Sequence, residues 1–242
     1  MSNVFYAPGE QRAAKVNDLF AAIARRYDLL NDLQSFGLHR RWKHRVVQLA
    51  AVRPGQRALD VCCGTGDIAL ALAQFGTEVT GLDFSQAMLQ IAETRRQKNQ
   101  QSSDTNPKFI QGDAQQLPFS DNSFDAITVG YGLRNLASWE TGLLEMFRVA
   151  KPGARLLVLD FGKPPNRLWR AIYFGHLRCS VPLIGRLFCG NADAYAYILE
   201  SLKHYPAQQG VAEKMRELGL SNVRVINLLG GAMAINYGEK PP

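Results

Sequence analysis

The chain has 242 residues, of which 46% are hydrophobic and 20% are charged, a balance that is ordinary for a globular protein with a large core. No apolar run is long enough to span a bilayer and the N-terminal segment lacks the apolar core of a signal peptide, so we expect neither feature. The four cysteines show no CxxC pair and no metal-ligand spacing, which predicts reduced thiols in a cytoplasmic protein without a metal site. The net charge of +7 favours a nucleic acid or an anionic membrane surface as partner, with solubility alone as the simpler explanation.

The first 54 residues predict a helical cap ahead of the first strand. Apolar side chains recur at helical spacing over residues 16–27 and again over residues 42–50. Two segments of this cap, YDLLN at 27–31 and SFGLHRRWK at 35–43, are rich in polar and aromatic residues. We expect the cap to cover a ligand site, although a pair of amphipathic helices that only covers the core would explain the pattern equally well.

The segment RALDVCCGTGD, residues 57–67, carries the clearest local signal. Residues 58–61 predict a buried strand, the glycines at 64 and 66 predict a tight turn, and residues 67–73 are strong helix formers that continue to Gly76. A strand, a glycine turn and a helix open a nucleotide-type βαβ unit. Glycine is needed in such a turn because a side chain would keep the ligand away from the backbone.

Two cofactors compete for this turn. The glycine spacing matches the dinucleotide fingerprint, and Asp83 lies near the distance expected of a ribose-binding acid. Asp60 and Asp67, however, flank the turn, and Asp67 stands where a helix N-terminus would receive a pyrophosphate. A carboxylate there repels phosphate but suits a sulfonium and an ammonium group. The local charge therefore predicts S-adenosylmethionine rather than NAD.

Three later strands predict where the remaining ligand-binding groups lie. The strands are expected at residues 77–83, 108–111 and 124–129. Asp83 ends the first of them and is placed to accept both ribose hydroxyls, while Asp113 follows the second and is placed to accept the adenine amine beside the Ala114 backbone. The third leads into the loop GYGLRN at 130–135, at the sheet edge where open α/β folds bind ligands.

The second half of the chain predicts a helix capped by Ser138, a strand at 154–161 and then a break in the alternation. Residues 162–205 are expected to form a helical insertion that covers the site, interrupted at Pro182 and Gly185 before a second helix. A helix from Pro206 and an antiparallel strand pair close the chain. The fold class is therefore α/β, a single domain with a Rossmann-like, mostly parallel seven-stranded sheet. Its parts are expected at 1–54, 55–161, 162–205 and 206–242.

Several segments together resemble the ubiquinone/menaquinone C-methyltransferase family over nearly the whole chain. Cys62 stands where the family usually has a small residue such as glycine, and residues 179–195 match only loosely. The segments that carry the resemblance are YDLLN with SFGLHRRWK, CCGTGD, GDAQQLPF at 112–119, YGLRN at 131–135 and RVAKPG at 148–153.

The resemblance implies a class I methyltransferase that transfers the methyl group of S-adenosylmethionine to a ring carbon of a prenylated quinol. The catalytic assignment falls on Arg134, Asn135 and Tyr131. Since a guanidinium is a poor proton acceptor, we expect Arg134 to stabilise the phenolate and to hold a water that relays the proton to His176, His204 or Tyr131. The ring type, the tail length and the formation of a homodimer stay open. The cofactor-binding residues are expected to be Asp60, Gly64, Thr65, Gly66, Asp83, Asp113, Ala114 and Gly130.

The basic charge suggests a route to a bilayer-dissolved substrate. In residues 166–186 an apolar stripe is bordered by four arginines, which predicts reversible attachment to the anionic inner face of the membrane. The alternative is that the stripe packs on the sheet and the arginines face water. The stripe comprises Trp169, Ile172, Tyr173 and Leu177, and the arginines are Arg167, Arg170, Arg178 and Arg186.

Three other functions compete with this one. An RNA methyltransferase would also be basic and bind S-adenosylmethionine, but no NPPY-type motif follows the fourth strand and no RNA-binding module is appended, so we expect no nucleic acid partner. A dinucleotide dehydrogenase fits the glycines but not Asp67. A non-catalytic S-adenosylmethionine-binding partner of a quinone-synthesis complex fits every cofactor residue and differs only in the chemistry.

Overall fold

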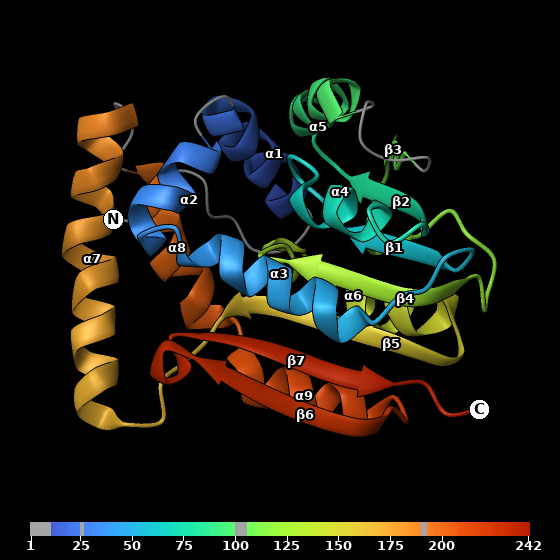
Figure 1. Ribbon diagram of the computed structural model, residues 1–242. Helices are drawn as coiled ribbons and strands as arrows, with labels where there is room; N and C mark the ends of the chain where they lie inside the picture. Colours follow the sequence, from blue (N-terminus) through green and yellow to red (C-terminus); the bar gives the residue numbers. More distant parts are fainter. Residues whose placement is uncertain (1–10, 25–26, 100–105, 190–192) are drawn as a thin grey trace.

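Seven strands form one sheet in the computed structural model, which describes residues 11–24, 27–99, 106–189 and 193–242. Their order across the sheet is β3-β2-β1-β4-β5-β7-β6 (Figure 1). The five strands β1 to β5 are parallel, and β7 runs antiparallel between β5 and β6. The predicted mostly parallel sheet with a closing antiparallel pair is thus confirmed. The strands are β1 (Arg57–Val61), β2 (Glu78–Asp83), β3 (Lys108–Gln111), β4 (Phe124–Gly130), β5 (Ala150–Phe161), β6 (Ser221–Leu228) and β7 (Met233–Glu239).

Successive side chains of the central strands point to opposite faces of the sheet, so the core consists of two layers, one on each face. In β5, Leu156 and Val158 pack on one face, and Leu157 and Leu159 pack on the other. The first layer includes side chains of α6 (Trp139–Val149) and α9 (Ala207–Glu217), and the second includes side chains of α3 (Leu38–Ala50) and α4 (Asp67–Ala73). Because both faces are covered, the central strands consist of nearly continuous apolar runs.

The N-terminal cap contains three helices where a pair was predicted. They are α1 (Gln11–Ile23), α2 (Tyr27–Ser35) and α3, and the break between the last two falls at Phe36 and Gly37, both with positive φ. Periodicity did not reveal this break because it falls between the two stretches, 16–27 and 42–50, in which apolar side chains recur at helical spacing. Residues 1–10 of the cap expected at 1–54 lie outside the described residues. Helix α5 (Gln86–Asn99) follows β2.

Two predicted boundaries around prolines were wrong. Strand β5 begins at Ala150, so Pro152 lies inside it. A register shift between β4 and β5 lies beside this proline, so the sheet does not need the backbone N–H that proline lacks. Helix α7 (Arg167–Cys189) continues through Pro182 and Gly185 (Figure 1). A proline removes one backbone hydrogen bond of the helix. The turns on either side of it keep their own hydrogen bonds, so this 23-residue helix continues through the proline.

The apolar stripe of α7 does not form one outward surface. Tyr173 and Leu177 are buried in the core, whereas Ile172 is 55% exposed. Trp169 is partly buried and donates a hydrogen bond from Nε1 to the Leu229 carbonyl at 3.0 Å. The predicted membrane-facing stripe is therefore wrong in composition, and the Arg186 side chain lies outside the described part of the chain. In the described ranges, no helix combines the length and apolarity needed to cross a bilayer.

Candidate active site

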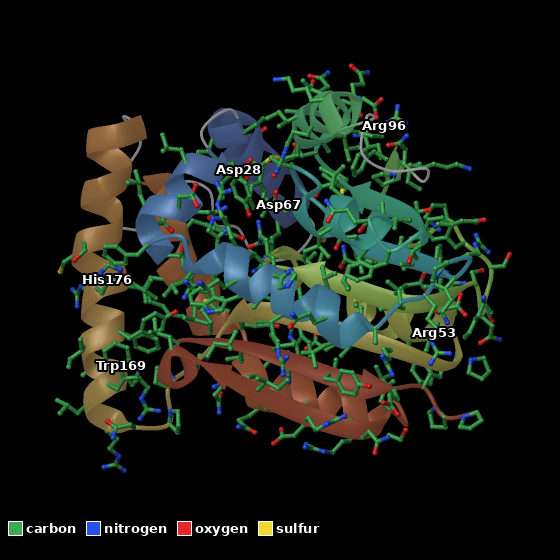
Figure 2. The ribbon with its side chains drawn as sticks, in the orientation of Figure 1. Asp28, Arg53, Asp67, Arg96, Trp169 and His176 are labelled. Atoms are coloured by element: carbon green, nitrogen blue, oxygen red, sulfur yellow. The ribbon has the colours of Figure 1, made fainter. Side chains whose placement is uncertain are left out.

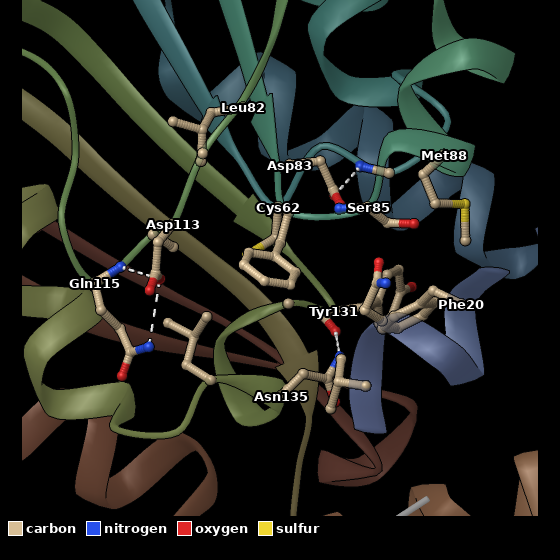
Figure 3. Close-up of a pocket in the computed structure, with 18 of the residues that line it drawn as sticks. Phe20, Cys62, Leu82, Asp83, Ser85, Met88, Asp113, Gln115, Tyr131 and Asn135 are labelled. Atoms are coloured by element: carbon tan, nitrogen blue, oxygen red, sulfur yellow. Dashed lines mark hydrogen bonds between the residues drawn. The ribbon is translucent and has the colours of Figure 1, made fainter. Parts of the chain in front are cut away.

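A cavity with an empty volume of about 730 Å³ opens at the carboxyl ends of β1, β2, β3 and β4. It is lined by the glycine turn after β1, the end of β2, the segment after β3 and the loop after β4, with α1 and α2 covering it. Seven of the predicted site residues line it, and Figure 3 shows four of its side chains, Asp83, Asp113, Tyr131 and Asn135, around the same space. The seven are Gly64, Asp83, Asp113, Ala114, Gly130, Tyr131 and Asn135.

Asp83 connects the glycine turn to the end of β2. Its Oδ2 accepts a hydrogen bond from the Gly64 N–H at 2.7 Å, and its Oδ1 accepts one from the Ser85 N–H at 2.8 Å. Burial raises the pKa of this carboxyl, and the two backbone bonds oppose that shift. Each carboxylate oxygen has a second acceptor lone pair, so the residue can hold its own turn and still accept a ligand hydroxyl.

The residues present fit an adenosyl cofactor. A Cβ added to Gly64 would meet no protein atom within 4 Å, so the cavity beside the backbone there has room for a ligand. Asp113 accepts hydrogen bonds from the Gln115 N–H at 2.8 Å and from the Gln115 amide at 3.3 Å, which hold its carboxylate at the cavity wall (Figure 3). Leu82 and Met88 also line the cavity and supply the apolar surface that an adenine ring requires.

Three predicted cofactor residues lie off this cavity. Asp60 is 1% exposed and accepts hydrogen bonds from Thr128 Oγ1 at 2.8 Å and the Ala69 N–H at 3.1 Å. Burial raises the pKa of its carboxyl to about 7. Asp60 and Thr65 line a smaller cavity of about 290 Å³ that shares Gly64 and Gly130 with the first, and Gly66 lines none of the described cavities. Their cofactor roles remain predictions.

Asp67 is paired with two cations, which corrects the electrostatic argument made from the sequence. Lys43 Nζ lies 2.6 Å from one of its oxygens and Arg95 Nη2 lies 2.5 Å from the other. Burial raises the pKa of Asp67, but the two cations outweigh it and lower the pKa to about 2. Its charge is thus compensated, and an unpaired carboxylate cannot be the reason that the turn favours S-adenosylmethionine over NAD.

The same cations bind the N-terminal cap to the glycine turn. Arg95 also lies 3.2 Å from Asp28 of α2 and donates to the Thr65 carbonyl at 3.0 Å, while Thr65 Oγ1 donates to Asp28 at 3.0 Å. Figure 2 shows Asp28 and Asp67 close together at the centre of the molecule. Sequence reasoning missed Lys43 and Arg95 because only the fold brings α3 and α5 to this turn.

A second cavity of about 480 Å³ adjoins the first and shares Phe20, Tyr27 and Tyr131 with it. Its walls are mostly apolar or aromatic, and α8 (Asp193–His204) contributes Tyr197 and Ile198. The predicted insertion therefore reaches the site through α8. Arg134 lines this second cavity and not the first.

Arg134 is buried in an ion pair. Its Nη1 lies 2.6 Å from Asp160 Oδ1 and donates to the Tyr131 carbonyl at 2.7 Å. The side chains of Arg134 and Asp160 are 6% and 4% exposed. Burial lowers the pKa of the guanidinium, but the Asp160 carboxylate and the neighbouring Tyr197 and Tyr27 together raise it more, so the net pKa is raised and the group stays charged. The pair fixes the loop after β4 to β5.

Three residues that line the two cavities carry buried polar atoms without a protein partner. They are Tyr131 Oη, Arg134 Nε and Asn135 Oδ1. Burying such groups unpaired costs about 1–3 kcal/mol each. A ligand with hydroxyl groups would satisfy them, and these atoms therefore indicate a polar ligand beside the first cavity.

Of the three proton acceptors predicted from the sequence, only Tyr131 lines a described cavity. His204 is exposed on α8, with Nε2 3.7 Å from Glu200, and His176 lies on α7 (Figure 2). Burial raises the pKa of the Tyr131 phenol well above its ordinary value, so the phenol stays neutral and its unpartnered O–H is available to donate to a ligand.

Comparison with known proteins agrees with this geometry. A Desulfitobacterium hafniense protein named demethylmenaquinone methyltransferase is 43% identical over 96% of this chain and 92% of its own length. An Azotobacter vinelandii ubiquinone/menaquinone biosynthesis C-methyltransferase UbiE is 40% identical over 97% of this chain and 93% of its own length. The crystal structure of a SAM-dependent methyltransferase from Aquifex aeolicus, 19% identical, shares the fold with a TM-score of 0.57, over 81% of this chain and 88% of that one.

The ubiE/COQ5 methyltransferase family model matches residues 9–240, nearly the whole chain. The glycine turn, the two acids beside it and the sheet order are those that an S-adenosylmethionine site in this fold requires. On these grounds the chain belongs to the ubiE/COQ5 methyltransferase family, whose members are S-adenosylmethionine-dependent enzymes.

Proposed function

We propose that this enzyme methylates a ring carbon of a prenylated quinol, converting demethylmenaquinol to menaquinol or acting on the corresponding ubiquinone precursor. The names of the D. hafniense and A. vinelandii relatives support this substrate class. The observation that carries the proposal is the second cavity, where aromatic and aliphatic walls meet unpartnered polar atoms next to the cofactor cavity. A quinol has this combination of an apolar ring and two hydroxyl groups.

Cofactor binding is assigned to the acids of the first cavity. Asp83 would accept the ribose hydroxyls and Asp113 the adenine amine, with the Ala114 backbone at the ring edge. S-adenosylmethionine supplies an electrophilic methyl group when it is bound there. The wall shared by the two cavities, Phe20 with Tyr27 and Tyr131, would hold the quinol ring against that position, and such positioning supplies much of the rate of a bimolecular transfer.

The ring carbon becomes nucleophilic when its neighbouring hydroxyl loses a proton. Arg134 stays charged and has Nε free of protein partners, so it would stabilise the phenolate oxygen directly. Tyr131 Oη and Asn135 Oδ1 would orient the quinol hydroxyls. Because no acidic or imidazole group other than the partnered Asp160 adjoins Arg134 among its described contacts, a bound water is the proposed relay for the proton.

The proposal is tested in one reaction mixture containing radiolabelled S-adenosylmethionine, a chemically reduced prenylated naphthoquinol and, in parallel, a benzoquinol. We expect label in the quinol fraction, with turnover that disappears when the quinol is left oxidised. Transfer RNA and NAD serve as controls for the competing functions. Label in RNA, or tight cofactor binding with no transfer to either quinol, would refute the proposal in favour of an RNA methyltransferase or a non-catalytic partner.

The loop that carries Tyr131 and Arg134 packs tightly against the glycine turn, which makes a second test. A Cβ on Gly132 would lie 2.3 Å from Cys62 Cβ and 2.9 Å from its sulfur. Gly132→Ala should therefore displace the loop and reduce turnover, on the order of 100-fold for a displacement of about 1 Å. Gly132 has φ −100°, so alanine suits the backbone itself.

A change at Cys62 should restore the activity lost in Gly132→Ala, because the Cys62 side chain occupies the space next to Gly132. Cys62 also has φ +53°. Cys62→Gly removes both clashing atoms and relieves the left-handed conformation. The double variant Cys62→Gly with Gly132→Ala should regain most of the turnover measured under saturating substrates. Equal activity in the single and double variants would show that this contact does not position the loop.

We also infer that the enzyme works at the inner face of the membrane. A prenylated quinol dissolves in the bilayer, and the net charge of +7 favours contact with anionic lipid.

A further inference from the structure

A groove lies between α7 and α8 of the insertion, lined by residues of both helices. It has an empty volume of about 1210 Å³, including solvent at its open side. Its floor is apolar and is formed by Ala171 and Phe174 of α7 with Leu199 and Leu202 of α8. We call this surface the α7–α8 groove; none of its lining residues lines the cofactor cavity or the second cavity.

Four cations border the apolar floor. Lys163, Arg170, Arg178 and Lys203 all line the groove, and no acidic residue is among its described lining residues. Arg170 and Arg178 make no side-chain hydrogen bond or ion pair with another described residue. Lys203 pairs with Glu200 at 2.7 Å, outside the groove lining, and Lys163 Nζ donates to the Tyr205 carbonyl at 2.7 Å. The groove is therefore strongly positive.

Next to the groove, α7 exposes an apolar ridge. Leu168 is 73% exposed and Ile172 is 55% exposed, one helical turn apart on the same face. Ala171 of the groove floor directly precedes Ile172 of this ridge in the chain, so the ridge and the groove adjoin. Large exposed apolar side chains beside unpaired arginines form the pattern of a surface that meets a lipid interface, because acyl chains take the apolar part and headgroup phosphates take the cations.

We propose that the α7–α8 groove and the Leu168–Ile172 ridge dock on an anionic phospholipid surface, with lipid phosphates on Arg170 and Arg178 and acyl chain on the groove floor. A nucleic acid would use the four cations but not the apolar floor, and a neutral prenyl tail would use the floor but not the cations. The inference rests on the proposed function only for its purpose, which is access to a substrate dissolved in the bilayer.

The test is flotation of the full chain with vesicles of phosphatidylcholine, with and without phosphatidylglycerol. Wild type should float with the anionic vesicles and not with the neutral ones, and salt should release it. Arg170→Glu with Arg178→Glu should weaken binding at least about 30-fold, since each basic residue near the surface contributes about 1 kcal/mol. Leu168→Ser with Ile172→Ser should also weaken binding to the anionic vesicles. Both side chains are exposed, so these substitutions should leave folding undisturbed.

The matched control is Arg53→Glu with Arg216→Glu, which changes the net charge equally at exposed positions outside the groove. Figure 2 shows Arg53 on the side of the molecule opposite α7. The control should float like wild type. Equal flotation of the groove variant and the control, or no flotation of wild type, overturns the docking surface. A wild type that floats as expected but methylates no quinol, with or without a tail, refutes the proposed function and leaves the docking surface supported.

Discussion

Replacing Arg134 by lysine is expected to lower turnover by about 100-fold or more, the effect of removing one donor that faces charge developing in a transition state. Lysine keeps the charge beside Asp160 but loses Nε, the guanidinium atom that lacks a protein partner. Affinity for S-adenosylmethionine should change little, because Arg134 does not line the cofactor cavity. Single-turnover kinetics and calorimetry on the same preparation separate the two quantities.

Arg134 also holds the loop after β4, so its removal must be separated from unfolding. Arg134→Ala alone leaves the Asp160 carboxylate buried without its partner, which costs about 3–5 kcal/mol of stability. Arg134→Ala with Asp160→Asn removes that charge, and we expect this variant to fold and bind cofactor but not to turn over. Wild-type turnover in Arg134→Lys, or in this double variant, would mean that the residue serves the loop alone and that the proposed phenolate stabilisation is wrong.

Asp83→Ala is expected to weaken S-adenosylmethionine binding by about 30-fold or more, because two ribose donors lose their acceptor at about 1–3 kcal/mol each. The same change frees the Gly64 and Ser85 N–H groups, so part of the loss could come from the turn itself. A cofactor analogue without the two ribose hydroxyls distinguishes the contributions. Wild type should lose affinity for this analogue, and Asp83→Ala should bind it no more weakly than it binds the natural cofactor.

The control for that measurement is Asp121→Ala, which removes the same charge at a carboxylate that is 68% exposed and lies far along the chain from the glycine turn. Its calorimetric affinity should equal that of wild type. If Asp83→Ala also keeps wild-type affinity, the ribose assignment fails, and Asp113 with the turn backbone must account for cofactor binding.

Local pattern was sufficient to predict that several of the named site residues line one cavity. Parallel strands place their carboxyl ends at one edge of a sheet, so the acids at the ends of β2 and β3 and the loop after β4 had to lie together once the strands were identified. Asp83, Asp113 and Tyr131 accordingly line one cavity. Sequence reasoning also identified the antiparallel closing pair, because Gly230 and Gly231 separate two short apolar strands.

Only the tertiary structure decided which charges are compensated and which helix faces are covered. Lys43 and Arg95 come from α3 and α5 to neutralise Asp67, a pairing across long sequence separations that no spacing rule contains. On α7 the helical period correctly identified a stripe, but period alone cannot say what a stripe faces. Tyr173 and Leu177 are buried because they pack against the core, whereas Ile172 and the α7–α8 groove are exposed at the surface. Local pattern thus predicted which strand ends meet at the cavity, whereas long-range packing determined the electrostatics around the cavity and the surface beside it.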